Sequence, residues 1–191
     1  MSDGALVGPN AILQTAVALE AQGGRALARQ VFDAAGLGAL LDDPPAAMVP
    51  EAQAAALMRA LHATLPPDTA RRVSHDAGHR TGDYILQNRI PAPARALLRV
   101  LPARLAAPIL LRAVAAHAWT FAGSGRVEIG AGRSARLLIH DNPLAMRGSD
   151  WHRAVLEVLF QRLVHPRAGV RQSASCAEGA RACVFEIGIG G

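Results

Sequence analysis

Apolar residues in the first half of the chain recur at the three- and four-residue spacing of amphipathic helices. Asn10 precedes such a stripe and predicts a first helix over residues 10–23, and a second over 25–35 is expected to end at Gly36. Prolines begin the later helices, which are predicted over residues 50–65, 67–88 and 102–119, the last one kinked at Pro108. Pro91 and Pro93 are expected to interrupt the chain between the last two helices.

The pattern changes from Gly123 onward to the alternation of β-strands. Residues 126–129 and 135–139 predict one hairpin, and residues 170–175 and 183–189 predict a second. A helix over residues 151–164 lies between them. We therefore expect an α+β fold in one domain, residues 1–191. Its first part, residues 1–121, should be mainly helical. Its second part, residues 122–191, should be an antiparallel sheet with this helix and a hairpin that carries Cys176 and Cys183.

Arginine supplies all the positive charge, and one apolar segment contains arginines but no acidic residue. The chain of 191 residues is 51% hydrophobic and 18% charged with a net charge of +5, which excludes a disordered chain. Between Tyr84 and Val127 there is no acidic residue, and the arginines there are Arg89, Arg95, Arg99, Arg104, Arg112 and Arg126. Apolar surface interleaved with arginine suits a large flat ligand with carboxylates, or an anionic membrane surface, better than nucleic acid.

The longest apolar run covers residues 105–121 and contains Pro108, Arg112 and His117. This run falls short of the roughly 20 apolar residues that a membrane span needs. The N-terminus also lacks the pattern of a signal peptide, and two cysteines cannot form a disulfide framework. We expect a cytoplasmic protein that is able to make peripheral contact with a membrane.

Two pairs of side chains have metal-ligand chemistry. His75 and His79 share a helix face, but Asp76 stands where zinc hydrolases have glutamate, so surface histidines are the favoured interpretation. Cys176 and Cys183 flank a turn and can share a metal, form a disulfide or act as small buried apolar residues. The last alternative is favoured, because two thiolates make only half of a zinc site.

His117 is the strongest candidate for ligand binding. A histidine among apolar and aromatic residues such as Trp119 and Phe121 can give an axial nitrogen to a metalloporphyrin, while Arg112 pairs with a propionate. The alternative is a core histidine that bonds a backbone carbonyl. No Gly-x-Gly-x-x-Gly motif joins a strand to a helix, so a nicotinamide or flavin site is not expected. Reduction chemistry would need an external donor.

Several runs of residues resemble the bacteriochlorophyll 4-vinyl reductase family of purple photosynthetic bacteria. They are residues 8–10, 48–49, 77–86, 89–91 and 118–125, together with the ending Cys176-x-x-Gly179-x-x-x-Cys183-x-Phe185. The resemblance covers nearly the whole chain. The cysteine ending is typical of the wider 4-vinyl reductase domain, which is related in fold to Golgi-transport tethering subunits and haem nitric-oxide sensors.

This resemblance implies a ligand-binding domain, often dimeric, that acts on chlorophyll precursors in the cytoplasm or at the photosynthetic membrane. We expect a carrier without a permanently bound cofactor that holds a magnesium porphyrin or protochlorophyllide and delivers it to enzymes of the pathway. The predicted ligand-binding residues are His117, Trp119, Phe121, Arg112, Tyr84 and Arg89. One alternative is an 8-vinyl (4-vinyl) reductase using NADPH. Another is an interaction module whose ligand pocket has decayed.

The resemblance extends to phenol-sensing relatives of this domain, which look to bind zinc through the terminal cysteine pair and an additional Cys or Glu earlier in the chain. The matching stretches here are residues 148–150 and 172–173, and they contain neither residue. We therefore predict no stable zinc, or at most a weak site that Asp150 completes beside Cys176 and Cys183.

Overall fold

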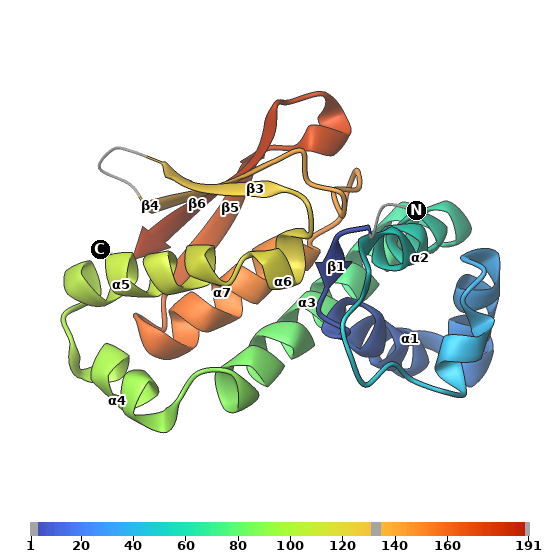
Figure 1. Cartoon of the computed structure of the whole chain (residues 1–191), viewed down its shortest axis with the longest axis horizontal. Coiled ribbons are helices and arrows are strands. Elements are labelled where there is room, and N and C mark those ends of the chain that lie inside the picture. The colour runs from blue at the N-terminus through green and yellow to red at the C-terminus, as the bar shows by residue number, and fades with distance from the viewer. Residues whose placement is uncertain (1–3, 131–134, 190–191) are drawn as a thin grey trace.

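Helices form the N-terminal part of the molecule, and an antiparallel sheet with one inserted helix forms the C-terminal part (Figure 1). The computed structural model describes residues 4–130 and 135–189. The helices are α1 (Asn10–Ala34), α2 (Glu51–Thr64), α3 (Pro67–Asn88), α4 (Ala92–Val100), α5 (Ala103–Ala116), α6 (Trp119–Ala122) and α7 (Trp151–Leu163). Two short 3-10 helices, η1 and η2, cover Gly38–Leu41 and Cys176–Glu178. This arrangement confirms the predicted α+β fold.

The main sheet has the strand order β3-β4-β6-β5, with every neighbouring pair antiparallel. Its strands are β3 (Arg126–Gly130), β4 (Ala135–His140), β5 (Ala168–Ala174) and β6 (Ala182–Ile189). Both predicted hairpins are thus confirmed, although residues 131–134 of the first turn lie outside the described residues. A second small sheet pairs β1 (Leu6–Val7) with β2 (Val49–Pro50).

Helix α1 contains both of the first two predicted helices. They join at Gly23 and Gly24, whose backbone angles are not helical. Gly24 has a φ of +73°, a conformation that glycine adopts without the steric cost of a Cβ. The boundary read from the sequence is therefore a kink within one helical segment.

The prediction for the region around the prolines missed two features. Pro91 and Pro93 follow the end of α3 at Asn88 as expected, but they also begin α4, which was not predicted, because a proline in the first helical turn lacks only an N–H that would have no partner there. Helix α5 contains Pro108 as expected but ends at Ala116 instead of near residue 119. The chain turns at His117, and the separate short helix α6 follows.

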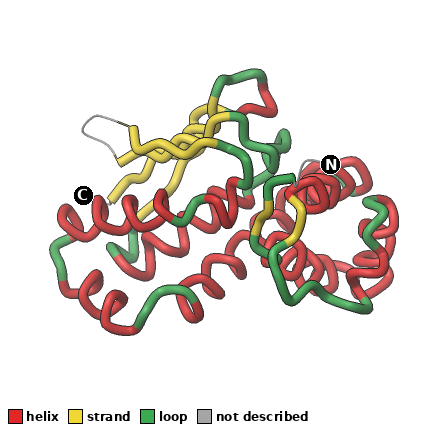
Figure 2. The backbone as a smooth tube through the Cα atoms, viewed as in Figure 1, coloured by secondary structure: helices red, strands yellow, loops and turns green. Residues whose placement is uncertain are grey.

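Helix α7 lies between the sheet and α3 (Figure 2). Gly78 and Gly82 of α3 allow this close approach, since a Cβ would collide with the carbonyl oxygen of Trp151 at one position and with the Val158 side chain at the other. Gly78 therefore serves helix packing, and His75 and His79 beside it are only partly buried, in agreement with the surface interpretation. Among the described residues, no helix is both long and apolar enough to cross a bilayer.

Candidate functional site

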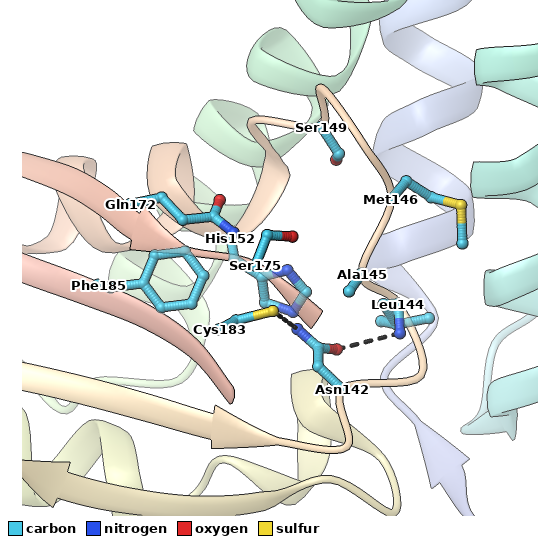
Figure 3. A pocket seen from close by; sticks show the side chains of 10 residues that line it. All are labelled: Asn142, Leu144, Ala145, Met146, Ser149, His152, Gln172, Ser175, Cys183 and Phe185. Atoms are coloured by element: carbon cyan, nitrogen blue, oxygen red, sulfur yellow. Dashed lines mark hydrogen bonds between the residues drawn. The ribbon is translucent and has the colours of Figure 1, made fainter. Parts of the chain in front are cut away.

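A small pocket lies between β6, the start of α7 and the loop that follows β4 (Figure 3). Its best-connected polar group is Asn142, whose side-chain oxygen accepts from the Leu144 amide at 3.0 Å while its Nδ2 donates to Cys183 Sγ at 3.6 Å. The amide of Cys176 also donates to Cys183 Sγ, at 3.3 Å. Burial raises the pKa of the Cys183 thiol, so the thiol and not the thiolate is the resting form.

His152 is the buried aromatic partner of this pocket. Its ring lies edge-on to Trp151 with centroids 4.8 Å apart, and also contacts Phe121 and Phe185. His152 Nε2 lies 3.2 Å from the Phe121 carbonyl oxygen, which can only accept, so Nε2 carries the proton. Burial lowers the pKa of His152 to about 4 and keeps the ring neutral at physiological pH.

These groups do not form a nucleophilic dyad. The Nε2–H of His152 is committed to Phe121, and the raised pKa of Cys183 opposes thiolate formation. The pocket volume is about 10 Å³, which is enough for one water molecule. Because the groups are buried and mutually bonded, the arrangement stabilises the junction between α7 and the sheet.

The residues considered for metal binding are mostly engaged elsewhere. Asp150 accepts from Arg153 through both carboxylate oxygens, at 3.1 and 3.0 Å. Cys176 Sγ donates to the Ile139 carbonyl at 3.6 Å. His79 lies 3.4 Å from an Asp83 oxygen. In the part of the chain that the structure describes, no three His, Cys, Asp or Glu side chains gather closely enough to hold a metal ion.

A second, much larger hollow opens where the C-terminal ends of α3 and α7 meet α4. It is an open depression with a volume of about 460 Å³. The residues that line it are Asp83, Leu86, Gln87, Arg95, Arg99 and Arg162. Three guanidinium groups against one carboxylate make this hollow electropositive, and its surface is mainly polar because Leu86 is buried.

The arginines of the hollow differ in how firmly they are held. Arg95 donates from Nη1 to the carbonyls of Leu86 and Gln87, at 2.7 and 3.1 Å, and so binds α4 to the end of α3. Arg99 donates from Nε to the Arg162 carbonyl at 3.2 Å, which leaves its two terminal nitrogens for another acceptor. Arg162 is exposed, and its guanidinium bonds no other described residue. Free guanidinium donors at an open hollow fit a carboxylate or phosphate ligand.

The six predicted ligand-binding residues are divided between two regions. Tyr84 and Arg89 lie at the end of α3, with the guanidinium carbon of Arg89 6.0 Å from the Tyr84 ring centre, and this end of α3 also lines the hollow. Of the remaining four residues, Arg112 lies on α5, His117 in the turn after it, and Trp119 and Phe121 on α6, toward the opposite end of α5 from the hollow (Figure 1).

His117 is exposed and not part of the core. Its Nδ1 lies 2.9 Å from the Ala113 carbonyl oxygen, so Nδ1 carries the proton and the lone pair remains on Nε2. Trp119 is 56% exposed, whereas Phe121 is half-buried against His152.

Sequence reasoning missed Arg162, since no pattern within α7 reveals a contact with Arg99, which lies 63 positions earlier.

Two curated proteins match nearly the whole chain. The bacteriochlorophyll synthase 23 kDa chain of Cereibacter sphaeroides is 47% identical over 187 residues, covering 95% of this chain and 89% of the relative. The protein of the same name in Rhodobacter capsulatus is 39% identical over 186 residues, covering 95% and 86%. No protein-family profile matches the chain.

Proposed function

The chain belongs to the family of the bacteriochlorophyll synthase 23 kDa chains, and on that premise we propose that it binds a tetrapyrrole intermediate of bacteriochlorophyll synthesis. Its role is to hold a magnesium porphyrin or protochlorophyllide and to pass it to enzymes of the pathway. The observation that carries the proposal is the electropositive hollow between α3, α4 and α7.

The chemistry of the hollow fits the polar edge of such a ligand. Tetrapyrrole intermediates carry carboxylates, and planar guanidinium groups bind carboxylates through paired charge-assisted hydrogen bonds. Arg99 and Arg162 supply free donors, and Arg95 is anchored by backbone carbonyls.

The experiment is an absorbance and fluorescence titration of the full chain with magnesium protoporphyrin and with divinyl protochlorophyllide. The double variant Arg99→Gln/Arg162→Gln should weaken binding by about tenfold to a hundredfold, the equivalent of losing one or two charge-assisted hydrogen bonds. Arg167→Gln is the matched control, because Arg167 is exposed just beyond α7 and does not line the hollow. Equal affinity of the double variant and the control would refute this placement of the ligand.

The exposed end of α5 offers a second placement of the same ligand. In His117 the proton is on Nδ1, so the lone pair of Nε2 is free. This is the tautomer in which a histidine can be an axial ligand of a metalloporphyrin. If the magnesium binds there, His117→Ala shifts the Soret band of the bound pigment while Arg99→Gln/Arg162→Gln leaves it unchanged. The opposite result assigns the ligand to the hollow.

The same titration separates a carrier from a reductase. Repeating it with NADPH leaves the vinyl spectrum unchanged if the protein only carries the pigment. Donor-dependent formation of the ethyl product would establish a vinyl reductase, and the absence of both binding and conversion would leave an interaction module.

A further inference from the structure

Helix α4 and the first half of α5 expose large apolar side chains on their outer surface. Leu97 is 54% exposed, Val100 78%, Leu105 56% and Ile109 44%. Three- and four-residue spacing places each pair on one side of its helix. Pro93 and Pro108 are also exposed. We refer to these six residues as the α4–α5 face, and the two helices meet at the end of the molecule farthest from α1 and α2 (Figure 1).

Uncompensated positive charge accompanies the α4–α5 face. Arg104 and Arg112 are exposed on α5, and neither forms an ion pair with the described residues. Other arginines do find carboxylates, as Arg80 does with Asp76 at 2.9 Å and Arg153 with Asp150 at 3.0 Å. The sequence contains no acidic residue between Asp83 and Glu128, so no carboxylate within this stretch repels an anionic surface.

We propose that the α4–α5 face docks on a lipid bilayer rich in anionic headgroups. The aliphatic side chains would enter the boundary between headgroups and acyl chains, while Arg104 and Arg112 pair with lipid phosphates. Charge complementarity favours this partner, because apolar residues flanked by unpaired arginines and free of acids match an anionic interface.

Docking in this orientation leaves the electropositive hollow accessible. Arg95 and Arg99, which line the hollow, occupy the opposite side of α4 from Pro93, Leu97 and Val100 at about 3.6 residues per turn. The inference therefore goes beyond the proposed function and does not depend on it. Vesicles without pigment test it separately from tetrapyrrole binding.

The experiment is a flotation assay of the full chain with vesicles of phosphatidylglycerol and phosphatidylcholine, compared with pure phosphatidylcholine. Val100→Asp/Leu105→Asp should lower the partition coefficient on the mixed vesicles at least about tenfold, because it puts charge into the apolar face. Val17→Asp is the matched control: Val17 is 42% exposed on α1, and its replacement should leave binding unchanged. Circular dichroism checks that each variant retains its helices.

A charge-reversal pair tests the electrostatic part. Arg104→Glu/Arg112→Glu should reduce binding to the mixed vesicles at least about tenfold, whereas Arg59→Glu/Arg71→Glu, on exposed positions of α2 and α3, should have a much smaller effect. Equal binding of the wild-type chain to mixed and neutral vesicles would overturn the proposal, as would unchanged binding of Val100→Asp/Leu105→Asp. A third outcome would also overturn the proposal: the wild-type chain binds no vesicles but forms a dimer, and Val100→Asp/Leu105→Asp abolishes this dimer. That result would show that a second copy of the chain covers the face.

Discussion

Replacing His152 by a residue that cannot titrate should remove a large part of the acid sensitivity of this protein. His152 is buried among Trp151, Phe121 and Phe185, and burial lowers its pKa from 6.5 to about 4. In the unfolded chain the imidazole takes up a proton near its ordinary pKa, but the folded state resists protonation until the pH is far lower. The unfolded state therefore binds more protons between about pH 6.5 and 4, and stability falls as the pH falls through this window.

The two pKa values give the size of the effect. Linkage between protonation and folding, with a folded pKa of about 4 and an unfolded pKa of 6.5, predicts that His152 alone costs about 2 to 3 kcal/mol of unfolding free energy between pH 7.5 and 4.5. The variant His152→Phe keeps an aromatic ring in the cluster but loses the bond to the Phe121 carbonyl, so its absolute stability differs from that of the wild type. The change with pH is the quantity to compare.

The measurement is urea unfolding followed by circular dichroism at several pH values from 7.5 to 4.5. The wild type should lose about 2 to 3 kcal/mol more than His152→Phe over this range. His152→Gln, which retains a donor for the carbonyl, should behave like His152→Phe. His62, whose pKa burial also lowers, is present in all three proteins and cancels in the comparison. Parallel loss of stability in wild type and variants would refute the assignment of a buried neutral imidazole.

Two further expectations concern packing and thiol reactivity. Gly82→Leu should lower the free energy of unfolding by about 2 kcal/mol or more, because the new side chain would collide with Val158. Gly169→Ala, at an open position of β5, should change it by less than about 0.5 kcal/mol. Chemical denaturation measures both values. A thiol reagent at pH 8 should modify the half-buried Cys176 well before Cys183, because burial and a raised pKa protect the Cys183 thiol. Mass spectrometry of the modified peptides measures the order of reaction. Reaction of Cys183 first, or equally fast, would refute this expectation.

Local patterns predicted most of the secondary structure. The prolines before α2, α3 and α5 and the alternation of Cys183, Phe185 and Ile187 mark their elements because helix and strand geometry repeat within a few residues. The same reasoning failed at α4, where a proline that can begin a helix was taken as a break. The residue runs also indicated a relationship with proteins of bacteriochlorophyll synthesis, and the names of the two relatives agree, although neither name mentions a vinyl reductase.

The sequence by itself determined the α+β class, the two hairpins and the arginine-rich, acid-free segment, since each of these depends on residues close together in the chain. Only the tertiary structure decided that His152 is buried, that Gly78 and Gly82 join α3 to α7, and that Arg99 and Arg162 meet at one hollow. Burial and the pairing of distant side chains result from the packing of whole elements, and residue spacing within one element carries no record of which partner lies against it.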